Sequence, residues 1–203
     1  MIRVFLAVLL EERLKSQIAS LQDSVKKRWA SHADASVRIQ WVGPHRVHLT
    51  LKFLGAIEEA QLMEIRQAVR PIVERARPMS LTLGPMGVFP DIRAPRVLWL
   101  GSLPDADASA LVELAVAVDR ALVPLGFQPE ARPFRPHLTL ARIKDGWRSA
   151  GQAFLRGGIL ERPATVDPFP IGAIHLMESE LLPSGPRYTS CWSLSLGAAA
   201  GSS

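Results

Sequence analysis

Two copies of the tetrapeptide His-Leu-Thr-Leu occur in the chain, one beginning at His48 and the other at His137. Alternate side chains of a β-strand share one face, so His48 would lie beside Thr50, and His137 beside Thr139. An imidazole titrates near neutral pH, so one histidine can accept a proton while the other donates one. Threonine hydroxyls can hold phosphate oxygens. Four such side chains that meet across a groove could cleave a phosphodiester without a metal ion.

The repetition is the informative part of this pattern. A single His-x-Thr on a strand most often reflects packing or a surface pair of polar side chains. Two identical copies, a little under half the chain apart, suggest instead a duplicated unit. The leucines of each copy would face the opposite side of the sheet and pack beneath helices.

The apolar pattern of the first half predicts a buried strand over Arg3–Val8 and a helix whose buried face carries Leu14, Ile18, Leu21 and Val25. The elements expected after it are strands over 37–41 and 47–54, a helix over 58–77 that Pro71 should kink or shorten, and a strand over 80–83.

The second half repeats this order. Residues 84–96 are rich in Gly and Pro and are expected to form a loop. The predicted elements that follow are a strand over 97–100, a helix over 111–122, a strand over 136–141, a helix over 147–155, and strands over 171–177 and 188–196. The pattern also allows a strand around Phe127.

These elements predict an α+β fold with two pseudo-symmetric lobes. Each lobe would be an antiparallel sheet flanked by helices, and the groove between the lobes would hold the active site. We expect a single bilobal domain over residues 1–196, built from approximate half-repeats 1–90 and 91–196. A flexible tail is expected over 197–203.

Composition limits the class of protein. A hydrophobic share of 48% in 203 residues supports a real core, and the only cysteine, Cys191, suits a reducing compartment such as the cytoplasm. A net charge of +5 points weakly to an anionic partner such as RNA. No segment approaches the ~20 apolar residues of a membrane span, so we expect no membrane partner, and we expect a monomer.

The motifs resemble the two signatures of the two-histidine phosphoesterase superfamily, and in particular its RNA 2′,3′-cyclic phosphodiesterase branch, also described as 2′-5′ RNA ligase-like. Further segments support this branch along nearly the whole chain: RVFLAV, WVGPHRVHLTLKFLG, GVFPDIRAPRVLWLG, FRPHLTLAR and LMESELLPSGPRYTS. The resemblance implies a bilobal fold and hydrolysis of a nucleoside 2′,3′-cyclic phosphate to a 2′-phosphomonoester. It implies no cofactor.

The resemblance also implies residue roles. His48 matches the proton donor to the departing 3′ oxygen, and His137 matches the base that activates water; the chemistry of two identical motifs could not assign these roles. Thr50 and Thr139 match contacts to the phosphate oxygens. Arg142 matches a family arginine that binds the phosphate, although strict alternation turns it away from His137. Arg142 can reach the phosphate only if the strand bends, bulges or ends near Ala141, and the alternative is a solvent-facing arginine.

Other histidines and arginines carry weaker signals. His45 and His48 form His-x-x-His, but on a strand this spacing separates them and no acidic or cysteine ligand is near, so we expect no metal site. His175 is expected to be structural, and His32 to lie in an exposed loop. Arg96 could line the groove or begin a strand. Phe89 could stack on a base, although core packing is the more frequent fate of such a residue.

We therefore expect a metal-independent hydrolase that acts on RNA ends or nucleotides bearing 2′,3′-cyclic phosphates. Two alternatives stay open: reversible 2′-5′ RNA ligation at the same site, and an RNA- or nucleotide-binding module without turnover. Product analysis would separate the first from hydrolysis, and a turnover assay would exclude or establish the second.

Overall fold

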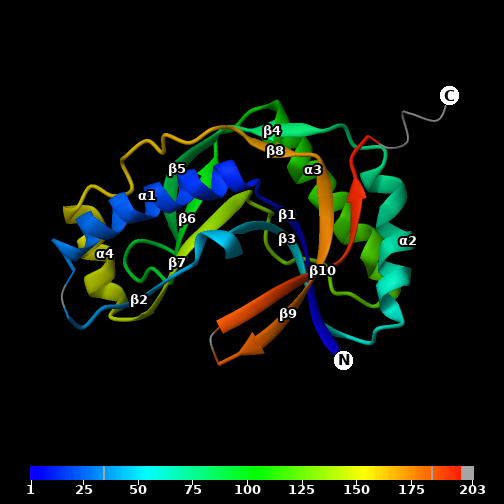
Figure 1. Ribbon diagram of the computed structural model, residues 1–203, viewed down its shortest axis with the longest axis horizontal. Helices are drawn as coiled ribbons and strands as arrows, with labels where there is room; N and C mark the ends of the chain where they lie inside the picture. Colours follow the sequence, from blue (N-terminus) through cyan, green and yellow to red (C-terminus); the bar gives the residue numbers. More distant parts are fainter. Residues whose placement is uncertain (34, 184, 198–203) are drawn as a thin grey trace.

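An antiparallel sheet of eight strands runs through the protein, whose computed structural model describes residues 1–33, 35–183 and 185–197 (Figure 1). Its strand order is β10-β9-β1-β3-β7-β6-β5, with β2 paired to β7. A small second sheet contains β4 and β8. The predicted α+β class is confirmed. The tail expected over 197–203 falls almost entirely outside the described residues.

The strands are β1 (Ile2–Leu9), β2 (Arg38–Trp41), β3 (His48–Ile57), β4 (Met79–Leu81), β5 (Leu83–Phe89), β6 (Val97–Ser102), β7 (His137–Asp145), β8 (Phe169–Ile171), β9 (Ala173–Leu182) and β10 (Gly185–Ser195). The α-helices are α1 (Glu12–Ala30), α2 (Gln61–Val73), α3 (Ala106–Leu122) and α4 (Trp147–Arg156). Two short 3₁₀ helices are η1 (Pro44–Arg46) and η2 (Val123–Leu125). No helix in the described ranges is both long and apolar enough to cross a membrane.

The two lobes draw their strands from both halves of the chain. One lobe contains β1 and β3 together with β9 and β10, and α2 and α3 lie beside it (Figure 1). The other contains β5, β6, β7 and β2, with α1 and α4 beside it (Figure 1). The element order still repeats near residue 90, because β1 and β6 each precede a long helix and a motif strand. Each half therefore contributes strands to both lobes.

The lobes are joined edge to edge by the two motif strands. Strands β3 and β7 share one residue pair, Leu49 with Leu138, before they diverge. All other pairings of β3 are to β1, and β7 pairs on with β6 and β2. The point at which the lobes meet is therefore the middle of both tetrapeptides.

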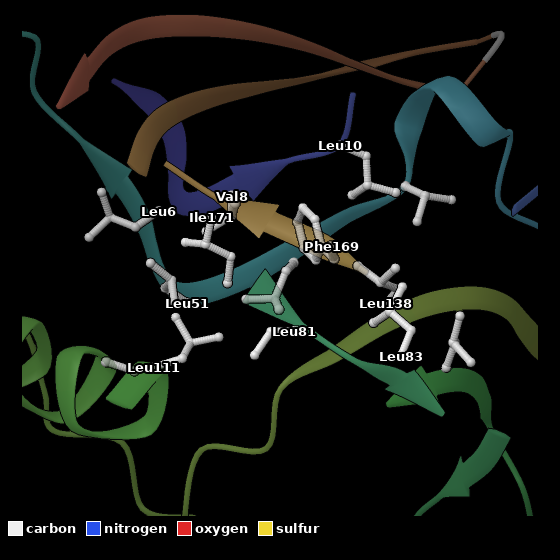
Figure 2. Packing of buried hydrophobic residues seen from close by; sticks show 14 of the residues in the cluster. Leu6, Val8, Leu10, Leu51, Leu81, Leu83, Leu111, Leu138, Phe169 and Ile171 are labelled. Carbon is white, nitrogen blue, oxygen red and sulfur yellow. The ribbon is translucent and has the colours of Figure 1, made fainter. Parts of the chain in front are cut away.

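A continuous core lies beneath this junction. Leu51 and Leu138 point from the motif strands into a cluster with Leu81, Phe169 and Ile171 of the small sheet (Figure 2). All five are buried, four of them at 1% exposure or less. Burying one leucine contributes about 1.5–3 kcal/mol, so this cluster fixes the leucine face of both strands.

The loop predicted over 84–96 is wrong in its first part. Residues Leu83–Phe89 form the edge strand β5, which pairs with β6. Proline is tolerated in an edge strand at an irregularity, and Pro85 lies where the register shifts between Leu83 and Met86. The strand allowed around Phe127 is absent: residues 126–136 carry no strand, and the Gln128 carbonyl instead accepts a hydrogen bond from the Lys52 ammonium at 2.8 Å.

Truncation of the leucine at the junction should destabilise the fold. Leu138 is fully buried, so Leu138→Ala is expected to reduce the free energy of unfolding by about 2–5 kcal/mol. The matched control is Leu181→Ala, since Leu181 is 71% exposed on β9 and its truncation should change stability by no more than about 0.5 kcal/mol. Denaturant titration measures both. Equal losses in the two variants would contradict the packing described above.

Candidate active site

The motif strands separate polar from apolar side chains by simple alternation. In β3, His48 and Thr50 are half-buried while Leu49 is buried. In β7, His137 and Thr139 are half-buried in the same way. The leucines enter the core, so the histidine and threonine side chains emerge on the other face of the sheet.

The two motifs lie directly opposite one another. Leu49 pairs with Leu138 in an antiparallel register. The antiparallel direction of this one pair sets His48 on the side of Thr139, and Thr50 on the side of His137, where the two strands begin to diverge. Two imidazoles and two hydroxyls therefore converge on one face, related by an approximate two-fold axis through the leucine pair.

Each imidazole is oriented by a backbone carbonyl. Nδ1 of His48 lies 2.7 Å from the Arg46 carbonyl oxygen, and Nδ1 of His137 lies 2.7 Å from the Arg135 carbonyl oxygen. A carbonyl oxygen only accepts hydrogen bonds, so each Nδ1 carries its hydrogen and donates it. Nε2 of both rings is then the nitrogen that is left to exchange a proton.

Aromatic rings flank both histidines. The His48 ring lies 4.8 Å from Phe5 and 5.2 Å from Tyr188, in the latter case edge to face. The His137 ring lies 5.1 Å from Phe89 and 6.4 Å from Trp99. Phe89 therefore adjoins the motif rather than lying in a separate loop. The other three aromatic residues come from strands that pair only in the folded chain, so no local signal in the sequence marked them.

Two glycines make room for Trp99. A Cβ atom at Gly87 would lie 2.1 Å from the Trp99 ring, and one at Gly101 would lie 2.8 Å from it. Gly87 is the cross-strand partner of Trp99. The glycines of β5 and β6 thus allow the indole to lie flat along the sheet beside His137.

The bulge needed for Arg142 is present in β7. Thr139 pairs with Trp99, but the next pair along joins Ala141 to Leu98, so Leu140 is an extra residue. Leu140 and Ala141 are both buried, and Arg142 is exposed. The extra residue reverses the alternation, and Arg142 emerges on the same face as His137. The first motif has an equivalent bulge. Ala7 pairs with Thr50 and Leu6 pairs with Lys52, so Leu51 is the extra residue in β3.

Burial and the arginine together lower the pKa of both histidines. The pKa of His48 and that of His137 lie below the ordinary value of 6.5, chiefly because burial disfavours the charged ring. The carbonyl hydrogen bonds act in the opposite direction, and the positive charge of Arg142 adds a further lowering of the pKa at both rings. One guanidinium thus acts on both imidazoles.

The symmetry of the site breaks at one pair of equivalent positions. Five residues after His48 stands Phe53, and five residues after His137 stands Arg142. Phe53 is 64% exposed, and its ring lies 5.8 Å from Phe5. The face is therefore apolar and aromatic beyond the first motif and cationic beyond the second.

The remaining candidates lie outside this cluster. His32 is exposed in the turn that follows α1, and His45 is exposed on η1. Arg96 is exposed and its guanidinium lies 4.1 Å from the Trp147 ring centre, so it covers α4. His175 pairs with Ala7, the neighbour of Thr50, and so lies one strand beyond the motif on the same face. Within residues 1–33, 35–183 and 185–197, no group of three or more His, Cys, Asp or Glu could hold a metal ion.

Comparison with known proteins identifies the family. The model of the 2′-5′ RNA ligase superfamily matches residues 10–181. The chain belongs to this superfamily. A protein of Methanothermobacter thermautotrophicus named RNA 2′,3′-cyclic phosphodiesterase is 35% identical over 188 residues, which cover 93% of this chain and 95% of that protein. An Aquifex aeolicus protein of the same name is 34% identical over 168 residues, 82% of this chain and 87% of that protein.

Solved structures agree with this assignment to the superfamily. A Thermus thermophilus protein has a TM-score of 0.71 at 26% identity, covering 96% of this chain and 98% of that one. E. coli LigT in complex with NADP+ has a TM-score of 0.69 at 25% identity, covering 97% and 98%. The predicted resemblance to this family is confirmed.

Removal of the arginine charge should raise the pKa of both histidines. A nearby cation disfavours a protonated ring, so Arg142→Gln is expected to move both titrations toward higher pH. In the unaltered protein both midpoints should lie below 6.5. NMR titration of the imidazole signals measures the four values. A shift at only one histidine would mean that Arg142 does not act across the junction.

Proposed function

We propose that the protein hydrolyses 2′,3′-cyclic phosphates of RNA ends or nucleotides to 2′-phosphomonoesters. The observation that carries this proposal is the pair of carbonyl-anchored histidines that meet, with two threonines, across the Leu49–Leu138 pair. The relatives named RNA 2′,3′-cyclic phosphodiesterase support the substrate class. Superfamily membership supports the reaction type.

In the proposed mechanism a water oxygen attacks phosphorus as the bond to the 3′ oxygen breaks. Nε2 of His137 takes the proton of the water, and protonated His48 gives its Nε2 proton to the departing oxygen. Thr50 and Thr139 donate to the non-bridging oxygens, and the Arg142 guanidinium offsets their charge. After turnover His137 is protonated and His48 is neutral, so one proton returns through solvent.

The asymmetry between Phe53 and Arg142 supports the roles given to the histidines. The leaving oxygen belongs to the nucleoside, whereas the attacking water does not. An exposed phenylalanine offers the ribose and base an apolar surface on the His48 side. A nucleoside held there would present its departing ribose oxygen, the 3′ oxygen in this proposal, to His48, and would leave the opposite side of phosphorus open toward His137.

Charge and composition support the remaining parts of the proposal. A net charge of +5 favours the polyanionic backbone of RNA over neutral substrates. A single cysteine, half-buried in β10, suits a protein of the cytoplasm. We propose that the protein acts as a monomer, since both histidines come from one chain.

The decisive experiment is product analysis with each nucleoside 2′,3′-cyclic phosphate in the presence of EDTA. The proposal predicts turnover without a metal ion and formation of the 2′-phosphate alone, because only the 3′ oxygen lies beside the proton donor. Phosphorus NMR distinguishes the two isomers. A 3′-phosphate or a mixture would overturn the assigned roles, and activity restored only by a divalent ion would overturn the metal-independent mechanism.

Loss of either histidine should impair turnover but not folding. His48→Ala and His137→Ala are each expected to lower kcat by roughly 10²–10⁴-fold, as for loss of a general acid or base. His32→Ala is the matched control, since His32 is an exposed histidine on another element, and it should leave kcat unchanged. Steady-state kinetics and thermal melting are measured together. Near-normal turnover in either motif variant would refute the two-histidine mechanism.

A further inference from the structure

Two polar side chains are buried in the described part of the chain, and both lie at the bulges of the motif strands. Gln22 is fully buried and Lys52 is 4% exposed. Lys52 follows the extra residue Leu51 in β3, and its ammonium lies 2.5 Å from the Asp119 carboxylate of α3. Gln22 reaches from α1 to the extra residue Leu140 in β7.

Gln22 donates both hydrogens of its side-chain amide to backbone carbonyls, one in β7 and one in the residue that follows β2. Nε2 donates to the Leu140 carbonyl at 2.9 Å and to the Val42 carbonyl at 2.7 Å. Both acceptors are carbonyls, which fixes the orientation of the amide. Oε1 is buried without a hydrogen-bond partner. The contribution of this side chain therefore lies in its two donors.

Because of the bulge, the Leu140 carbonyl does not take part in the hydrogen bonds between β7 and β6. Leu140 lies between the residues that pair with Trp99 and Leu98 and has no partner of its own in β6. Its oxygen accepts instead from the Val42 amide at 3.0 Å and from Gln22. Without Gln22 the buried Leu140 carbonyl would keep only the bond from the Val42 amide, and the bulge would lose one of its two anchors. If the strand then became regular, the one-residue change in alternation would turn every later side chain to the other face.

We propose that Gln22 is a positioning residue: its amide holds the bulge of β7 at Leu140, and the bulge keeps Arg142 on the face that carries the motif histidines and threonines. Gln22 touches no reacting group. It acts through Arg142 alone, which follows the extra residue Leu140 by two positions in β7. This inference rests on the proposed function for its kinetic readout, but its structural readout needs no substrate.

The first test is NMR titration of the two imidazoles in the free protein. Gln22→Met keeps the length of the side chain and removes both donors. If the bulge relaxes, Arg142 moves away and both histidines should titrate at higher pH, in the same direction as in Arg142→Gln. The titratable or charged groups on this face are the two motif histidines themselves, Arg142 from β7, Tyr188 from β10 beside His48, and His175 from β9, which is one strand beyond β1.

The second test is a double-mutant cycle in turnover. Arg142→Gln and Gln22→Met should each lower kcat/KM, by roughly 10- to 100-fold for loss of a charged hydrogen bond. If Gln22 acts through Arg142, Gln22→Met should add little once Arg142 has been replaced. Ile18→Val is the matched control, because Ile18 is fully buried one turn earlier on α1 and makes no polar contact with β7. It should change neither titration nor kcat/KM.

The outcomes separate this inference from the proposed function. Raised histidine titrations in Gln22→Met support the positioning role even if the protein turns over no cyclic phosphate. Unchanged titrations, or additive losses in the double variant, overturn it. Gln22→Asn, whose shorter amide cannot reach both carbonyls, should reproduce the shift if Gln22→Met does not fold. If neither variant folds cooperatively, Gln22 is a folding determinant and the positioning role is wrong.

Discussion

The contact on which the rest of the site depends is the pairing of Leu49 with Leu138. Both side chains are buried at 1% exposure or less, so the core fixes which face of each strand points inward. The polar residues on either side of each leucine must then share the outer face. Four side chains converge because the position of two leucines in one core determines the face on which two histidines lie.

A regular strand could place the histidines and threonines but not the residues beyond them. The bulges at Leu51 and Leu140 reverse the alternation immediately after each threonine. Because of these bulges, Phe53 and Arg142, each five residues after a motif histidine, lie on the same face of the sheet as that histidine. Buried polar contacts to α1 and α3 stabilise these irregular points, so helices on the core side help to determine the outer face.

Local periodicity explains which parts of the site could be predicted from the sequence. The alternation of side chains within each tetrapeptide depends only on neighbouring residues, so the sequence could predict which of them share a face. The strands and helices of the α+β fold were predicted in the same way, from the spacing of nearby apolar residues. The aromatic neighbours Phe5, Tyr188 and Trp99 could not be found, since strand pairings between distant segments bring them to the site. Gln22 was missed for another reason. The apolar pattern of α1 predicted Leu21 as a buried residue, whereas the side chain that is fully buried at this turn is the amide of Gln22.

A symmetric pair of histidines cannot by itself distinguish a proton donor from a proton acceptor. Each ring donates through Nδ1 to a carbonyl two residues earlier, and each has its pKa lowered by the same causes. The difference must come from what surrounds the pair. Phe53 and Arg142 stand at equivalent positions with opposite character, so a ligand that is apolar at one end and anionic in the middle has one favourable orientation. In the proposed function, the orientation of the substrate would then assign the roles of proton donor and proton acceptor to two chemically alike groups.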